Sequence, residues 1–200
     1  ATDAMYTAFN RSNFQQEIFE LYHDLITFGT AAMFIEEDEQ DLIKFSTRHI
    51  DEVYIAENDK GRIDTIYRRF KLSARAIVQK FGDKVSQDIL TMEKKDPYQE
   101  IEIIHAVYPR SDFDPNKKDK KNMPFESVYM EYKNKNELSV SGFKEFPFVV
   151  PRYLKASHEI YGRSPAMTAL PDVKMLNEMS KTTIKAAQKQ VDPPLLVPDD

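Results

Sequence analysis

Cysteine is absent from the 200-residue chain, and only five residues are glycine. Without cysteine there is no disulfide framework, no thiolate nucleophile and no cysteine-ligated metal site, although this absence does not identify the cellular compartment. Five glycines leave little material for phosphate-binding loops, and no GxGxxG, GxxxxGK[ST] or GxSxG motif occurs. A nucleotide-binding loop and the nucleophile elbow of a hydrolase therefore have no support.

Long apolar runs are also missing. No run approaches the roughly 18 residues that would span a bilayer, and the first ten residues show no basic stretch followed by an apolar one, as an export signal would. No membrane partner is therefore expected. The chain begins at Ala1 rather than at Met and ends at Asp200, shortly after the apolar run LLV, which suggests a fragment of a longer protein.

The chain has no excess of positive charge, because 33 acidic residues outnumber 28 basic ones and the net charge is -5. Contact with a polyanion would therefore need a local basic patch. Hydrophobic residues at 41% are ample for a core, and the length suits one or two domains. The four histidines are scattered without a metal-ligand spacing, so neither a metal nor a cofactor is expected.

The order of the predicted elements is a helix, several antiparallel strands with two short helices inserted, and a long helix. Ser12 and Gln15 stand at capping-box spacing at the start of the first helix, and Gly29 ends it. Because no βαβ alternation occurs, the fold class is α+β. Strands are predicted at 30–37, 41–47, 51–57, 62–71, 98–110, 126–133 and 137–143. Short helices are predicted at 72–82, with Ser73 as N-cap and Gly82 as C-terminal stop, and at 84–93.

Turn residues define the connections between these elements. Residues 58–61, Asn-Asp-Lys-Gly, tolerate the positive φ of a tight turn and predict an antiparallel hairpin. The acidic run 36–41 is expected at another hairpin tip, and residues 111–124 form a surface loop. Residues 146–154 form an extended segment whose prolines cannot donate to a ladder, which predicts a sheet edge or a position outside the sheet.

The segment YGRSPAMTALPD, residues 161–172, precedes the long helix and is interpreted as a structural joint. Ser164 fits the N-cap and Pro165 the first helical position, whereas Gly162 would let the chain turn. Pro171 is expected to break or kink the helix, and Asp172 to help start the longer piece, which runs to about residue 191.

Arg163 and Ser164 could instead be chemical groups held on a loop. As a nucleophile, however, Ser164 would need a neighbouring general base, and the guanidinium of Arg163 does not deprotonate at working pH. The capping interpretation is favoured, because residue type, spacing and the helix that follows all agree with it.

A stripe of lysines marks one side of the long helix and is the candidate basic surface of the chain. It consists of Lys174, Lys181, Lys185 and Lys189. A basic face of this kind could meet phosphates. The alternative is a solvated face in which Glu178 pairs with Lys174 at i,i+4 and with Lys181 at i,i+3, and for a monomer this alternative is favoured.

Longer strings in the sequence carry a family resemblance from about Ser12 onward. They include RHIDEVYIAENDKGRIDTIYRRFKLSARAIVQKFG, EIEIIHAVYPR, SVYMEY and GFKEFPFVVPRYLK. The most specific is EIYGRSPAMTALPDVKMLNEMSKTTIKAAQKQVDPPLLVPDD. Together they resemble the head-to-tail connector, or portal, protein of short-tailed bacteriophages.

This resemblance implies a structural protein that catalyses no reaction. Portals of this kind form a twelve-subunit ring at one capsid vertex, through which DNA is packaged and later ejected. The partners implied are other copies of the chain, scaffolding protein, terminase, capsid and tail adaptor proteins, and passing double-stranded DNA. The four lysines of the stripe would then face the channel or the DNA. The implied location is the virion, after assembly in the host cytoplasm.

By the same resemblance, residues 1–160 form a wing-like α+β domain, and residues 161–200 form the start of the stem helix and the exit toward the clip. Connectors of this group are much longer than 200 residues, so most of the stem and clip would be missing. Two other functions stay open. One is an enzyme acting on nucleic acid or another phosphate ester, with Arg163 and a carboxylate such as Asp172 in a cleft. The other is a different capsid or adaptor protein that shares only the wing-like sheet.

Overall fold

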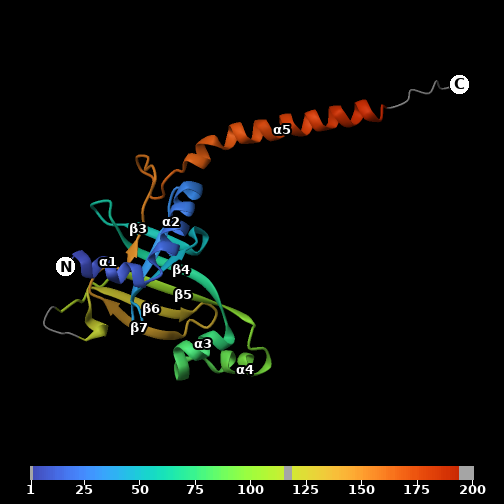
Figure 1. Ribbon diagram of the computed structural model, residues 1–200. Helices are drawn as coiled ribbons and strands as arrows, with labels where there is room; N and C mark the ends of the chain where they lie inside the picture. Colours follow the sequence, from blue (N-terminus) through green and yellow to red (C-terminus); the bar gives the residue numbers. More distant parts are fainter. Residues whose placement is uncertain (1, 115–118, 194–200) are drawn as a thin grey trace.

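A computed structural model describes residues 2–114 and 119–193 of the chain (Figure 1). The helices are α1 (Thr2–Arg11), α2 (Phe14–Phe28), α3 (Ala74–Phe81), α4 (Gln87–Lys95) and α5 (Pro165–Val191). The strands are β1 (Ala32–Asp38), β2 (Leu42–Arg48), β3 (Val53–Glu57), β4 (Ile63–Ser73), β5 (Glu100–Pro109), β6 (Phe125–Glu131), β7 (Glu137–Phe143) and β8 (Phe148–Val149). The element order confirms the predicted α+β class.

The strands form two antiparallel sheets rather than one. A three-stranded sheet has the order β2-β1-β8, and a five-stranded sheet has the order β3-β4-β5-β6-β7. Both predicted hairpins are confirmed, β1 with β2 and β3 with β4. In the second hairpin Gly61 takes a φ of 70°, and the Asn58 side chain accepts hydrogen bonds from the backbone N–H groups of Lys60 and Arg62.

Proline placement explains the short strand β8. It contributes only two residues, which pair with Met33 and Phe34 of β1 at the edge of the three-stranded sheet. Pro147 and Pro151 flank it, and a proline has no N–H to extend a ladder. The predicted edge position is therefore confirmed.

The start of α2 differs from the predicted capping box. Asn13, not Ser12, is the N-cap residue, and its side chain makes no cap hydrogen bond. Instead, the Asn13 amide donates to the Phe45 carbonyl at 2.8 Å and accepts from the Phe45 N–H at 3.0 Å. The local capping motif is replaced by a link between α2 and β2. At the other end, Gly29 has a φ of 80° and confirms the left-handed stop.

Helix α1 precedes the first element that the sequence pattern indicated. It is anchored by an aromatic cluster in which the Phe9 ring stacks on Phe14 at 4.8 Å and meets the edge of Phe45 at 5.9 Å. None of its residues is buried. The position of α1 therefore depends on a few contacts with α2 and β2, because the helix has no buried face.

Three buried apolar clusters hold the body together, where the body means the described residues from α1 to β8. One lies between the two sheets, one lies beneath α3 and α4, and one lies beneath α2. The predicted caps of α3 are confirmed, because the Ser73 hydroxyl accepts from the Ala76 N–H and Gly82 follows the helix with a positive φ. Helices α2, α3 and α4 thus cover sheet surfaces that would otherwise face water.

Helix α5 projects from this body as a separate rod (Figure 1). It has 27 residues and is continuous through Pro171, so of the predicted break or kink the break is absent, and Asp172 lies within the helix rather than starting a new one. Proline removes one backbone hydrogen bond and crowds the preceding turn, which bends a helix without ending it when the flanking turns stay bonded. Figure 1 shows the first turns of α5 inclined to the rest.

The far end of α5 agrees with the sequence pattern. Val191 is the last helical residue and Asp192 the C-cap, as expected from the prolines that follow. Most of the predicted exit, residues 194–200, lies outside the described residues.

Candidate functional site

Two glycines meet where α5 leaves the body. At Gly29, with φ of 80°, an added Cβ would lie 2.5 Å from the backbone of Arg163 and of Gly162. At Gly162, an added Cβ would overlap the carbonyl oxygen of Gly29. Gly162 is not among the positive-φ residues, so its backbone does not use the left-handed conformation that glycine favours. Its smallness matters because two backbones pass in contact there.

Hydrogen bonds fasten the same two segments. The Gly162 N–H donates to the Thr30 hydroxyl at 2.7 Å, and the Ser164 hydroxyl donates to the Thr27 carbonyl at 2.8 Å. Ser164 is 2% exposed, and its oxygen also accepts from the Met167 N–H at 2.9 Å. The predicted N-cap at Ser164 and the first helical position at Pro165 are both confirmed. The cap thus ties the start of α5 to the end of α2.

Segment 151–154 supports this contact from the other side. The Tyr153 N–H donates to the Gly29 carbonyl at 2.9 Å, and the Arg163 N–H donates to the Leu154 carbonyl at 2.7 Å. Isolated antiparallel bridges join Thr30 with Arg152 and Leu154 with Arg163. We call this arrangement of residues 27–30, 151–154 and 161–164 the joint.

An ion-pair cluster braces the outer side of the joint. The Glu57 carboxylate pairs with Arg152 and, at 2.5 Å, with Lys155. Arg152 also donates to the carbonyls of Ile160 and Gly61, at 3.1 and 3.2 Å. Hydrogen bonds from Lys155 and then Arg152 lower the pKa of Glu57 from its ordinary value. The turn of the β3–β4 hairpin is thereby held against the segment that leads to α5.

The tyrosine at the start of the joint segment is also anchored. The Tyr161 hydroxyl accepts from the Ile55 N–H at 3.2 Å and contacts the Val53 carbonyl at 3.4 Å. Residues 161–164 are therefore fixed to β3, to α2 and to segment 151–154, and α5 starts in a set direction.

Arg163 and Asp172, considered above as parts of a catalytic cleft, are placed differently. The Arg163 guanidinium pairs with Glu159, with a 2.9 Å bond from Nε to Oε2, and its side chain is 61% exposed. Asp172 is an exposed residue of α5. Within residues 2–114 and 119–193, no three His, Asp or Glu side chains are grouped as a metal ion would require. Nothing in this geometry supports the enzyme hypothesis.

The four predicted lysines all lie exposed on α5. At 100° per residue, Lys174, Lys181, Lys185 and Lys189 fall within one side of the helix. The Lys181 ammonium lies 3.2 Å from the Glu178 carboxylate, which is the i,i+3 pair expected for a solvated face. In the described part of the chain Glu178 forms no ion pair with Lys174, so only half of that predicted pairing is present. Whether the lysine face meets DNA stays a prediction.

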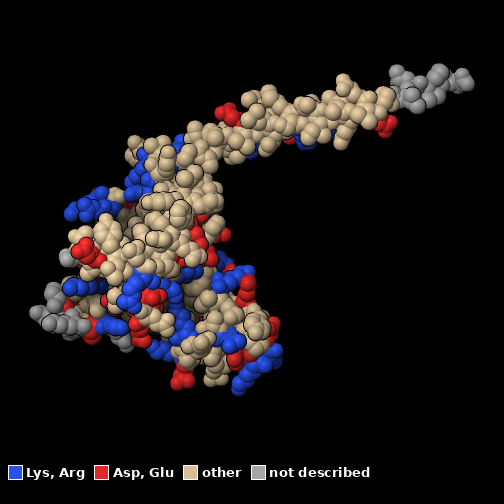
Figure 2. Space-filling model, in the orientation of Figure 1, with Lys and Arg blue, Asp and Glu red and all other residues tan. Residues whose placement is uncertain are grey.

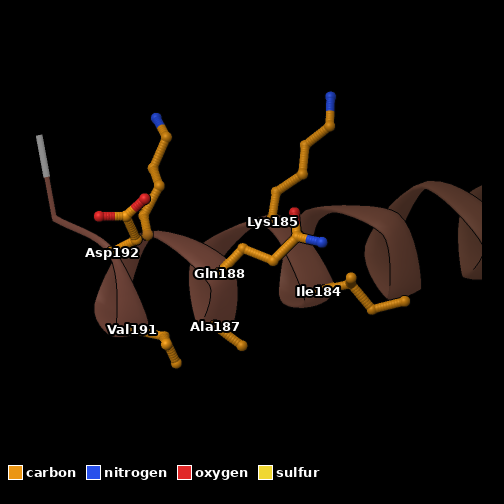
Figure 3. Close-up of a pocket in the computed structure, with 7 residues that line it drawn as sticks. Ile184, Lys185, Ala187, Gln188, Val191 and Asp192 are labelled. Carbon is orange, nitrogen blue, oxygen red and sulfur yellow. The ribbon is translucent and has the colours of Figure 1, made fainter.

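The other side of α5 carries apolar side chains in contact with water. Figure 2 shows the projecting helix as largely uncharged, beside a body with mixed charges. Ile184, Ala187 and Val191 point to one side in Figure 3, and Lys185 points to the opposite side. The hollow drawn there is lined by α5 residues and Asp192 alone, so it is an open surface rather than a binding cavity. None of the α5 residues is buried.

Several residues of the joint, and Glu57 beside it, were not predicted from the sequence. Thr27, Thr30, Glu57 and Arg152 carry no local signal, because each acts on a segment about 95 or more residues away along the chain. Gly29 was found only as a helix stop. Among the described helices, none combines the length and apolar character needed to cross a membrane.

Comparisons with known proteins point in one direction. The model of the bacteriophage head to tail connecting protein family matches residues 1–200. The chain is 37% identical over 199 residues to the portal protein of Salmonella phage epsilon15, which covers 97% of the chain and 36% of that protein. It is 33% identical over 201 residues to a probable portal protein of Bordetella phage BPP-1, covering 98% and 36% respectively. The chain thus spans about a third of the length of these relatives.

Proposed function

The chain belongs to the bacteriophage head to tail connecting protein family, and from this premise we propose that it is part of a portal subunit. In this proposal, twelve copies of the full-length protein form a ring at one capsid vertex. The ring is the channel for DNA packaging and ejection and the attachment point for the tail. The family is structural, and the subunit catalyses no reaction.

Helix α5 is the observation that carries the proposal. A helix of 27 residues is about 40 Å long. Most of the stability of a helix in a protein comes from the packing of its apolar face. Its exposed apolar residues include Leu176, Met179 and Ile184, which are 58, 56 and 59% exposed. Neighbouring copies in a ring, or chain that follows residue 200, would cover them. Residues 161–200 are therefore proposed as the start of the stem, and residues 1–160 as the wing.

The joint would set the angle between wing and stem. Gly162, Ser164 and Pro165 would fix the start of α5 against the body, and Pro171 with Asp172 would bend the helix. Because every copy in a ring must present α5 at the same angle, a rigid joint favours closure of the ring. The role proposed for these five residues is geometric.

The partners proposed for the ring follow from its place in the virion. They are capsid and tail adaptor proteins, with terminase and scaffolding protein during assembly in the host cytoplasm. Passing double-stranded DNA would meet the basic side of α5. Each copy in a ring would contribute the same lysines, so their weak individual charge would add up to a strongly basic surface.

Ring formation is tested on the full-length protein by light scattering and native mass spectrometry. A closed oligomer whose mass is a multiple of the subunit supports the proposal. Protein that stays monomeric at all concentrations contradicts it. Replacing Leu176 and Ile184 by Asp should reduce ring formation, whereas Lys94→Asp with Lys95→Asp on α4 is the control on an exposed helix of the body.

The lysine face is tested separately. Lys181→Glu with Lys185→Glu changes the charge of each subunit by four units, and around a ring the change is multiplied. We expect intact rings that package and retain less DNA, with a weaker dependence on salt. Lys94→Glu with Lys95→Glu makes the same charge change on α4. Packaging that is equal in both pairs of variants would show that the lysine face has no part in it.

A further inference from the structure

The body is built from three stacked layers. Leu21 of α2 and Met33 of β1 belong to the cluster beneath α2, whereas Phe34 of β1 and Ile66 of β4 belong to the cluster between the sheets. Met33 and Phe34 are adjacent in one strand, so their side chains leave opposite faces of the three-stranded sheet. The order of the layers is therefore α2, the three-stranded sheet and the five-stranded sheet.

One outer surface of this stack is the exposed side of α2. Phe19, Tyr22 and Ile26 recur at the spacing of one helix face, and they are 74, 53 and 54% exposed. Leu21, on the side that faces the body, is buried. We call Phe19, Tyr22 and Ile26 the α2 stripe. Helix α2 thus carries apolar residues on two sides, of which only one packs against the body.

The other outer surface is the face of the five-stranded sheet that points away from the three-stranded sheet. A row of register partners crosses this face from β3 to β7, namely Tyr54, Tyr67, Ala106, Val128 and Val140. Ile66 and Val107 are the strand neighbours of Tyr67 and Ala106, and they point the other way, into the cluster between the sheets. Tyr54 and Tyr67 are both exposed.

The next row on this face is also apolar at its centre, where Ile104 of β5 pairs with Met130 of β6. We call these two residues and the row from Tyr54 to Val140 the outer sheet face. None of its residues belongs to the three apolar clusters that the described residues form. Among the described segments, residues 120–123 lie over one edge of this side of the sheet, against Gly142.

The composition of β5 indicates that this face is covered in the assembled protein. Residues 103–108 contain no carboxylate, lysine or arginine, so the strand is apolar toward both sides of the sheet. An antiparallel sheet with one face in water alternates apolar and polar residues, whereas a strand covered on both faces does not. The outer sheet face therefore has the character of a surface that packs against another layer.

Helix α2 fits this surface in length and in charge. Its 15 residues extend about 22 Å, and five strands span about 19 Å from the first to the last. Beside its stripe α2 carries Glu20 and Asp24, and it contains no lysine or arginine. Arg69 and Lys71 are the exposed cations of β4 on the same side as Tyr67, and each pairs there with a glutamate of β5. Both can bind a further carboxylate at the rim of a contact.

We propose that the α2 stripe of one copy packs on the outer sheet face of the next copy, an inference that rests on the proposed ring. The two surfaces differ and lie on opposite sides of the body, so the contact is head-to-tail, and contacts of this type generate closed rings. A single helix buries less than the roughly 800 Å² per partner of a standard interface. The contact therefore acts together with α5 and is not expected to hold an isolated pair of copies.

The test places the photoreactive residue p-benzoylphenylalanine at position 22 of the full-length protein. Purified rings, assembled from a mixture of unlabelled and nitrogen-15-labelled copies, are irradiated, digested and analysed by mass spectrometry. We expect position 22 to be linked to β4, β5 or β6 of another copy. The same probe at position 98, where the exposed Tyr98 lies on neither surface, should give no link to those strands.

Substitutions on the two surfaces provide a second measurement. Tyr22→Asp with Ile26→Asp should raise the protein concentration needed for ring formation by at least about tenfold, and so should Tyr54→Asp with Tyr67→Asp. Tyr98→Asp, the control, should leave that concentration unchanged. All five side chains are exposed, so the variants should fold, and circular dichroism checks that they do.

The outcomes separate this inference from the proposed function. Rings in which the probe at position 22 is linked only to α5 or to its own copy would overturn the head-to-tail contact and leave the portal proposal intact. Links only to another virion protein would assign the α2 stripe to that protein instead. Unchanged ring formation in both pairs of variants would also refute the contact. Full-length protein that forms no ring would contradict both proposals.

Discussion

The body and α5 differ in where their stabilising contacts come from. The body encloses three apolar clusters, and side chains such as Ile66, Ile77 and Ile103 have no exposed surface. Helix α5 has 27 residues and buries none of them. The body is thus stabilised by its own tertiary structure, whereas α5 carries apolar surface suited to contacts with other chains or with later parts of its own. The same chain thus combines a body with its own apolar core and a helix whose apolar residues are exposed.

The largest contrast is expected from the same substitution made in both regions. Ile66→Ala should lower the free energy of unfolding by about 3 kcal/mol, because it leaves a cavity in the cluster between the sheets. Ile184→Ala on α5 should change it by less than about 0.5 kcal/mol, since Ile184 already faces water. Urea unfolding of the 200-residue chain measures both. Similar losses for the two variants would mean that α5 is packed against the body in solution.

The joint should be more sensitive than an exposed turn of similar backbone conformation. Gly29→Ala places a Cβ at positive φ and against the backbone of residues 162–164, and we expect a loss of at least about 2 kcal/mol. Gly61→Ala has a similar φ but no atom closer than 3.8 Å to the new Cβ, so only the cost of the conformation, about 1 kcal/mol, should appear. Equal losses would show that the contact between Gly29 and Gly162 does not constrain the joint.

The body should also respond to pH through His105, whereas α5 contains no histidine. The pKa of His105 is about 3 in the folded chain and about 6.5 when unfolded, so the unfolded state binds the proton first as pH falls. Stability should therefore be complete above about pH 6.5 and decline toward pH 3, with about 2 kcal/mol lost by pH 5.

Urea unfolding from pH 7 to pH 5 measures this decline. His105→Gln should flatten it, although the substitution itself lowers stability at all pH values. His23→Gln, at an exposed position of α2, should not. An unchanged slope in His105→Gln would contradict the assignment.

The N-cap serines of α3 and α5, Ser73 and Ser164, allow a comparison between the body and the joint. Ser73 accepts one backbone hydrogen bond at the start of α3, whereas Ser164 accepts one and also donates to the Thr27 carbonyl. Ser73→Ala should cost about 1 kcal/mol, and Ser164→Ala somewhat more, because a second buried partner is left unpaired. Hydrogen exchange at the first turns of α5 should rise only in the second variant. The reverse order of costs would exclude the proposed tie between α5 and α2.

The smallest effect on the body is expected from Pro171→Ala. Its removal restores a helical hydrogen bond and straightens α5, while the free energy of unfolding of the body stays within about 0.5 kcal/mol. In the full-length protein, sedimentation should reveal altered ring assembly. Pro165→Ala is the matched control, since a proline at the first helical position removes no helical bond. Normal rings from the Pro171→Ala protein would refute the geometric role of the bend.

The sequence by itself determined the features that depend on neighbouring residues. The turn at Asn58 and Gly61, the caps of α3 and the start of α5 at Ser164 and Pro165 were all predicted, because each follows from the φ preferences and hydrogen-bonding groups of a few adjacent residues. The α+β class and the strand order along the chain followed from the same local patterns. The family resemblance rested on longer strings.

Tertiary structure decided what depends on residues far apart in the chain. The capping box at Ser12 failed because Asn13 bonds to Phe45, and the role of Gly162 changed because Gly29 packs against it. Division of the strands into two sheets also lacks a local signal. In each case contacts between distant segments outweigh a local preference of about 1 kcal/mol, and a short stretch of sequence cannot show which distant backbone will lie against it.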